Sequence, residues 1–303
     1  MIHSFTITNY LGDSVKAELR RPETSGFLIQ SVTGLGPAKA TVNTTEVATD
    51  DGGAFNSARL EQRNIVFQLI FVETPEETIE DIRQKSYRYF PVKKRVEILV
   101  ETDNRHLKAT GYVESNEPEI FSSQEGAQIS VLCPDPYFYA GGKQVTDFCA
   151  IDPVFEFPFS NESLTEPLLV LSEVKNKAEG VVTYLGDAEV GIRICIHAAG
   201  EASGITLYNT GTREAMKIDT EKLKKLTGEG LHAKDDIIIN TARGEKSITL
   251  IREGVSYNIL NCLDKNADWF LLTKGDNQFG FTADEGITNL QFRVENAIVY
   301  EGV

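Results

Sequence analysis

The sequence predicts a mainly β protein built from two β-sandwich-like domains, the first of which carries one flanking helix. Most segments alternate apolar and polar residues over about four to eight positions and stop at Gly, Asn, Asp or Pro, as half-buried antiparallel strands do. One segment carries strong helix-start signals. Half of the ten prolines fall between Cys133 and Leu168, where they favour a connector over a central strand.

Strand signals extend through the whole chain. Each of the clearest segments has an apolar face with period two, bounded by turn-forming residues. These segments are Ile65–Phe71, Val96–Val100, Gly191–Ile196 and Ser247–Ile251.

The clearest helix is expected from Thr74 to about Phe90. Thr74 can cap it, Pro75 suits the first helical position, and Glu77 completes a capping box with Thr74. The apolar residues that share one face are Ile79, Ile82 and Phe90. This helix should therefore lie against a sheet.

A shorter helix is expected from Thr220 to Thr227. Asp219 precedes it as a cap and Gly228 follows it as a stop. Leu223 and Leu226 are expected to point inward.

Length and proline placement predict the domain organisation. A chain of 303 residues normally divides into two domains. We expect an N-terminal β-sandwich domain with one helix at 1–145, a proline-rich connector at 146–167, and a C-terminal β-sandwich domain at 168–303.

Composition excludes several classes of function. With 41% hydrophobic and 25% charged residues the chain is an ordinary globular protein, and its net charge of −15 disfavours specific binding to nucleic acid. No apolar run approaches the ~20 residues of a membrane helix, and Met1–Thr6 lacks the basic and apolar segments of a signal peptide. We therefore expect synthesis in the cytoplasm and no membrane association.

The sequence offers no recognisable catalytic, cofactor or metal site. Cys133, Cys149, Cys195 and Cys262 lack zinc-ligand spacing and are expected to be buried free thiols. Asp50-Asp51 is interpreted as a loop and Asp235-Asp236 as the polar start of a strand, and neither stretch has the alternating oxygens of a calcium loop. We expect no metal and no cofactor.

Catalysis is also not expected. His197 should point away from the neighbouring isoleucines of its strand, as a structural rather than a catalytic histidine. No nucleophile elbow or zinc-protease motif occurs, and nothing indicates the paired acids of a glycoside hydrolase. Trp269 lies in an apolar run and is more typical of core than of an exposed ring that stacks on sugar. The chain is therefore not expected to be an enzyme.

Two stretches resemble a known family. The strand Gln128–Cys133, followed by Pro134-Asp135-Pro136-Tyr137, resembles the end of the ring domain of siphophage distal tail proteins. The other N-terminal segments that agree with this family are Phe5-x-Ile7-x-Asn9, Gly34-Leu35-Gly36-Pro37, Arg59 and Arg63–Ile65. The C-terminal segments are Asp235–Thr241, Gly244–Ser247, Asn258–Leu260 and Trp269–Asn277.

The resemblance implies a structural virion protein at the tail tip of a phage or prophage. Such a protein forms a homohexameric ring that joins the tail tube to the baseplate and host-adsorption apparatus. The implied partners are the tail tube protein, the tail hub or tail-associated lysozyme, and receptor-binding proteins. The resemblance also implies that the N-terminal domain at 1–145 forms the ring, and that the C-terminal domain is a jelly-roll of the galectin-like or carbohydrate-module-like kind.

Two further expectations concern binding surfaces. Arg59 and Arg63 are candidates for subunit contacts, because arginine grips carboxylates with two parallel hydrogen bonds, although on a strand edge such a residue is often only a solvated charge. The alternative function is a carbohydrate-binding adhesion module that recognises host cell-wall glycans, with Trp269 as a possible contact.

Overall fold

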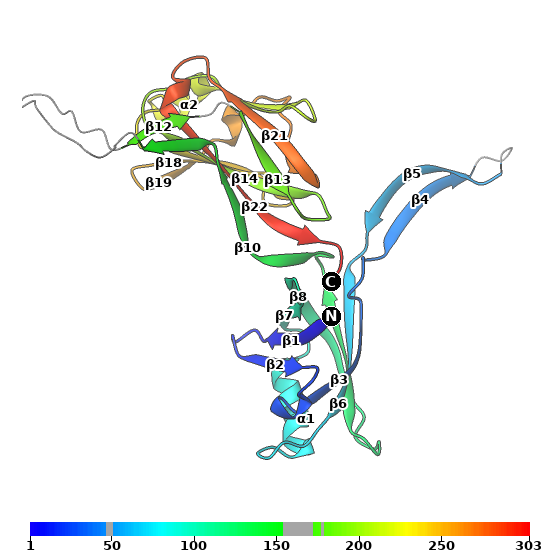
Figure 1. Ribbon diagram of the computed structural model, residues 1–303. Helices are drawn as coiled ribbons and strands as arrows, with labels where there is room; N and C mark the ends of the chain where they lie inside the picture. Colours follow the sequence, from blue (N-terminus) through cyan, green and yellow to red (C-terminus); the bar gives the residue numbers. More distant parts are fainter. Residues whose placement is uncertain (47–50, 154–171, 177–178) are drawn as a thin grey trace, which may run out of the picture. The chain divides into compact units, whose positions relative to one another are not determined.

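The computed structural model describes residues 1–46, 51–153, 172–176 and 179–303, and strands dominate it (Figure 1). The mainly β class predicted from the sequence is confirmed. The chain forms two compact units. Unit 1 comprises Met1–Gly141 together with Val299–Val303, and unit 2 comprises Gly142–Ile298.

Unit 1 is built around one antiparallel sheet with the strand order β2-β1-β7-β8-β9-β6-β3. Its strands are β1 (Ile2–Thr8), β2 (Ser14–Glu18), β3 (Phe27–Thr33), β6 (Arg63–Phe71), β7 (Arg95–Thr102), β8 (His106–Pro118) and β9 (Gly126–Cys133). A short 3-10 helix, Pro22–Thr24, precedes β3. The predicted strand Gln128–Cys133 is confirmed, and it ends at Cys133 because two prolines follow within three residues.

The predicted helix is present, but it begins later than expected. α1 spans Ile79–Tyr89, and its capping box joins Thr78 to Asp81. Thr74 instead accepts a hydrogen bond from the Glu77 amide, 3.0 Å long, within the preceding loop. Between Thr74 and Thr78 the chain has only Pro75, Glu76 and Glu77, and none of these side chains is buried, so packing does not stabilise a further helical turn there.

Aromatic rings join α1 to the sheet. Phe67 of β6 contacts Phe5 of β1 edge to face, with ring centroids 5.5 Å apart, and Phe90 at the end of the helix, 5.8 Å away. Ile82 is fully buried in the same core, and Ile79 packs against it. The predicted inward face of Ile79, Ile82 and Phe90 is therefore confirmed.

Unit 2 is a sandwich of two sheets around one core. One sheet contains β19-β18-β17-β14-β22 and the other β13-β21-β15-β16. The strands are β13 (Glu179–Tyr184), β14 (Val190–Ala198), β15 (Ile205–Asn209), β16 (Glu214–Ile218), β17 (Asp236–Asn240), β18 (Ser247–Arg252), β19 (Val255–Asn258), β21 (Gly275–Thr282) and β22 (Leu290–Tyr300). Buried residues of both sheets share one cluster, to which β14 contributes Ile192, Ile194 and Ile196.

Shorter elements complete the chain. β20 (Leu271–Leu272) pairs with β14, and β11 (Cys149–Pro153) pairs with β12 (Ser172–Asn176). The 3-10 helices are Leu260–Cys262 and Ile287–Asn289. Asn277 lies inside β21, and its side chain closes the preceding turn by hydrogen bonds with the backbone of Thr273.

α2 confirms the second predicted helix. It spans Thr220–Thr227, Asp219 caps it, and Gly228 ends it in the left-handed conformation at φ 85°. Leu223 is fully buried, but the expectation for Leu226 is wrong, because its side chain is 54% exposed. The buried face lies between Thr220 and Leu223, and Leu226 is displaced around the helix in the opposite direction.

Part of the predicted connector lies in described structure. Residues 146–153 fall in β10 (Phe138–Asp147), in β11 (Cys149–Pro153) and in Phe148 between them, whereas 154–167 fall outside the described residues. The domain boundaries remain a prediction. None of the helices in the described part is long and apolar enough to cross a membrane.

Candidate functional site

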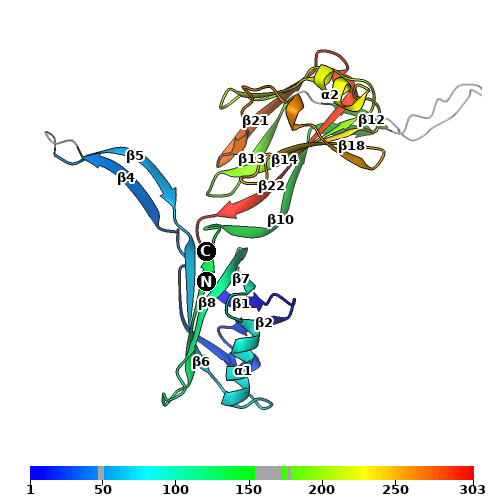
Figure 2. The same ribbon diagram turned by 180° about the vertical axis from the view of Figure 1, so that it is seen from behind.

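A two-stranded ribbon of unit 1 is the first candidate surface. β4 (Ala40–Glu46) and β5 (Gly53–Leu60) pair with each other and with no other described strand. Nearly all their side chains are exposed, and Figures 1 and 2 show the ribbon extending away from the rest of unit 1. Because an isolated two-stranded ribbon is only marginally stable in water, this one is suited to being covered by another chain.

The two faces of the ribbon differ in chemistry. Val42 lies opposite Ala58 and Thr44 opposite Phe55, so these residues share one face, on which Val42 is 55% and Phe55 67% exposed. The other face is polar, since Asn43 there donates to the Ser57 hydroxyl. One face of the ribbon is therefore an exposed apolar strip.

Arg59 lies on the polar face of the ribbon, opposite Thr41. Its side chain is exposed. Thr41 itself donates to Glu61 at 2.6 Å. The predicted role of Arg59 in subunit contacts remains a prediction.

Arg63 is placed differently, at the base of the ribbon, and is only 2% exposed. Its guanidinium donates to the backbone oxygens of Gly34, Gly36, Pro136 and Glu301. It also lies 4.3 Å from the centroid of the Phe138 ring. Within the chain, Arg63 therefore joins the segments on either side of the ribbon to the turn after β9 and to the C-terminal residues.

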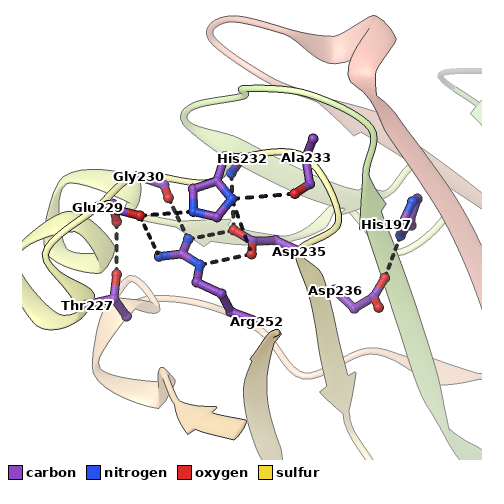
Figure 3. Close-up of polar contacts among 9 residues, drawn as sticks. All are labelled: His197, Thr227, Glu229, Gly230, His232, Ala233, Asp235, Asp236 and Arg252. Atoms are coloured by element: carbon purple, nitrogen blue, oxygen red, sulfur yellow. Dashed lines mark hydrogen bonds and ion pairs between the residues drawn. The ribbon is translucent and has the colours of Figure 1, made fainter. Parts of the chain in front are cut away.

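A buried polar cluster of unit 2 is the second candidate site (Figure 3). Asp235, with a side chain 1% exposed, accepts hydrogen bonds from Nε of Arg252 at 2.9 Å and from its Nη2. The backbone amide of His232 donates to the same carboxylate at 3.1 Å, and Arg252 also donates to the oxygen of Gly230. The His232 ring contacts Glu229 at 3.1 Å.

The electrostatics of this cluster favour a permanent ion pair. Burial by itself would raise the pKa of Asp235, but the hydrogen bonds from Arg252 and the His232 amide outweigh burial and hold that pKa below its ordinary value. Asp235 in turn raises the pKa of Arg252. A carboxylate held charged by this many donors is a poor proton acceptor. Asp235 instead joins the loop after α2 to β18 through its hydrogen bonds with Arg252.

The neighbouring histidine makes a separate, exposed contact. His197 points away from the buried isoleucines of β14, as predicted, and its Nδ1 lies 2.7 Å from Oδ1 of Asp236 (Figure 3). Among the described residues, none of the hydrogen bonds of His197 or His232 involves a serine or a cysteine. The arrangement therefore provides no activated nucleophile.

The described residues contain no group of three or more His, Cys, Asp or Glu side chains that could hold a metal ion. Cys133 and Cys262 are buried free thiols, as predicted, and Cys195 is half-buried. The side chain of Cys149 lies outside the described residues.

Trp269 packs partly buried against the core of unit 2, and Nζ of Lys246 lies 5.2 Å from its ring centroid. It is neither a fully buried core residue nor a freely exposed ring. Its proposed contact with glycan remains a prediction.

Sequence reasoning missed two features of these sites. The carbonyl oxygens that Arg63 bonds belong to Gly34, Gly36, Pro136 and Glu301, and nothing in the sequence links these separate segments to Arg63. Asp235 was interpreted as a polar strand start, although it is buried and paired. The one available signal was a charged residue directly before an apolar strand, which does not identify a partner.

Comparison with known proteins shows which solved structures have a similar fold. No family model and no curated protein matches the chain. Among solved structures, the chain matches the Dit protein (gp 19.1) of phage SPP1, with a TM-score of 0.64 and 15% identity. That protein is described as a paradigm of the hub adsorption apparatus in phages that infect Gram-positive bacteria. The match covers 97% of this chain and 98% of that one.

A chain of the phage P2 baseplate, solved in its activated conformation with Ca, also matches, with a TM-score of 0.46 and 12% identity over 100% of both chains. The likeness to SPP1 Dit shows that the chain has the fold of a phage hub protein. The predicted resemblance to distal tail proteins is confirmed at the level of the fold.

Proposed function

We propose that this chain is a structural, non-catalytic component of a phage or prophage tail tip, of the distal tail type. The observation that carries the proposal is the shared fold with SPP1 Dit, which extends over nearly the full length of both chains. The buried Asp235–Arg252 pair is consistent with it, since this pair joins a loop to a strand and plays a structural role.

The ribbon supports self-assembly into a ring. Its apolar strip, with Val42 and Phe55, is exposed in the single chain, and covering such a strip removes apolar area from water at about 25 cal/mol per Å². A contact between one ribbon and the body of the next copy joins two different surfaces. Such a head-to-tail contact repeats around an axis, and it forms a closed ring when the rotation between neighbouring copies divides a full turn evenly.

In the tail, the ring is proposed to be a homohexamer that joins the tail tube to the baseplate. The further proposed partners are the tail tube protein, the tail hub or tail-associated lysozyme, and receptor-binding proteins. The chain would be synthesised in the host cytoplasm and reside in the virion at the tail tip.

Immunogold electron microscopy tests this function directly. Antibodies raised against the chain are applied to particles of the phage that encodes it, and gold is expected at the tail end distal to the head. Gold on the head, along the tail shaft or absent from tailed particles would contradict the proposal. Light scattering of the purified chain, with negative-stain images, tests the ring separately.

The carbohydrate-binding alternative has less support. Stacking on sugar needs a free aromatic face, and Lys246 lies over the ring of Trp269. A glycan array probed with the full chain distinguishes the two functions, since host cell-wall glycans should give no signal that depends on Trp269.

A further inference from the structure

The turn between β8 and β9 presents an apolar and acidic tip. Phe121 is 103% exposed and Ile120 45% exposed, at a position where turns normally carry small polar residues. Glu117, near the end of β8, and Glu119 precede them in the chain and are also exposed. Glu125 at the base of the turn pairs with Arg83 at 2.8 Å, whereas no described cation pairs with Glu117 or Glu119. We call Glu117, Glu119, Ile120 and Phe121 the tip.

A second surface of unit 1 has the opposite charge. Tyr10 and Leu11, in the turn between β1 and β2, are 52% and 67% exposed, and Val92 is 47% exposed. Nζ of Lys94 lies 5.3 Å from the Tyr10 ring centroid, which brings the two loops together. In the described structure, no carboxylate pairs with Lys93 or Lys94. We call Tyr10, Leu11, Val92, Lys93 and Lys94 the patch.

The tip and the patch cannot contact each other within one chain. Figures 1 and 2 show the turn between β1 and β2 and the turn between β8 and β9 on opposite sides of unit 1. Each surface combines exposed apolar side chains with unpaired charge, and their charges are opposite. Complementary potentials of this kind steer association and fix the register of an interface.

We propose that the tip of one copy docks on the patch of the next copy, with Phe121 against Tyr10 and Leu11 and with Glu117 and Glu119 facing Lys93 and Lys94. This inference rests on the proposed function, because it names the partner surface within a ring. Tip and patch are different surfaces, so the contact is head to tail. Each subunit then uses both surfaces once, as ring closure requires.

Cross-linking of two variants that each carry one added cysteine, in a chain whose half-buried Cys195 is replaced by serine, tests the direction of the contact. Ser122→Cys places a thiol beside the tip and Ser14→Cys one beside the patch, both by near-isosteric changes. A bis-maleimide added to a mixture of the two variants should give a covalent dimer, while each variant alone and the unmodified chain should give none. The matched control mixes Ser122→Cys with Ser256→Cys, which lies on exposed β19 of unit 2.

Charge reversal tests the same contact independently. Glu119→Lys and Lys94→Glu should each raise the dissociation constant of self-association about tenfold, since each brings like charges together. The chain that carries both changes should regain most of the affinity, as measured by sedimentation velocity. Circular dichroism confirms that each variant is folded.

Either of two results overturns the inference. One is cross-linking of the tip and patch variants no stronger than that of the Ser256 control. The other is self-association that is absent, or unaffected by both charge reversals. If immunogold labelling still marks the tail end, either of these results would exclude only this interface and would leave the proposed function unchanged.

Discussion

Nη2 of Arg63 donates a hydrogen bond, 2.5 Å long, to the backbone oxygen of Glu301, a residue 238 positions later in the chain. The same guanidinium donates to Gly34 and Gly36, which precede the ribbon. The C-terminal residues therefore belong to unit 1, and the base of the ribbon is held by one buried side chain.

Replacing Arg63 with lysine should destabilise unit 1 by about 2 kcal/mol, because a single ammonium cannot reach all the carbonyl oxygens that the guanidinium fork bonds. Hydrogen exchange should also accelerate at Val303, whose amide bonds to Leu35 at 3.0 Å. Urea unfolding and exchange mass spectrometry measure these effects. Arg59→Lys is the control, since Arg59 is exposed; an equal effect of both changes would contradict the assigned role.

Gly34→Ala should destabilise the chain by about 2 kcal/mol or more. Gly34 has a φ of 82°, and an added Cβ would clash with the backbone oxygen of Asn64. Gly36→Ala is the matched control, because nothing lies within 4 Å of a Cβ placed there. Thermal unfolding of both variants checks the difference. Similar melting temperatures would show that the left-handed turn is not required.

Asp235→Asn should lower the free energy of unfolding by about 3 kcal/mol, because it leaves the charge of Arg252 without its buried partner. Asp236→Asn provides the neighbouring control. The side chains of Asp236 and His197 are each nearly half exposed. Loss of their contact should therefore lower the free energy of unfolding by at most about 0.5 kcal/mol. Urea titration at pH 7 measures both values, and equal losses would contradict the role assigned to the pair.

The Asp235 pair also predicts a pH dependence. The pKa of Asp235 is lowered in the folded chain, so the unfolded chain binds its proton first as the pH falls. The stabilisation is therefore complete at neutral pH and is lost as the pH falls from about 4 through the lowered pKa. Unfolding measured between pH 3 and 7 should show a smaller acid-induced loss in Asp235→Asn than in the unmodified chain.

The thiol of Cys133 should be nearly inert in the native protein. Burial raises the pKa of Cys133 to about 11, so at pH 8 only about one thiol in a thousand is ionised. Cys195, which is half-buried, should react faster. Alkylation followed by peptide mapping distinguishes the two residues. Labelling of Cys133 at the rate found in denatured protein would contradict its burial in the folded chain.

Phe55→Ser should weaken assembly without changing the stability of the single chain, because the ring of Phe55 is 67% exposed on the ribbon. Leu185→Ser is the matched control, with an equally apolar side chain that is 63% exposed in unit 2. Sedimentation velocity should show smaller assemblies for Phe55→Ser alone. Unchanged assembly would remove the ribbon from the subunit contact.

The sequence by itself determined the mainly β class, the main strands and the caps of α2. These depend on periodicity, caps and turn residues, which act between neighbours in the chain. The end of β9 at Cys133 was predictable for the same reason, since the prolines that stop it are adjacent. Periodicity also placed His197 on the face opposite Ile194 and Ile196.

Only the tertiary structure decided where α1 begins, what Asp235 pairs with and what surrounds Arg63. Thr74 and Thr78 both offer a local capping box, and the folded chain uses the second. Arg252 and Glu301 lie far along the chain from the groups they bond, so no local pattern identifies them as partners. Packing brings such residues together, and the energy of a buried charge depends on which groups packing supplies.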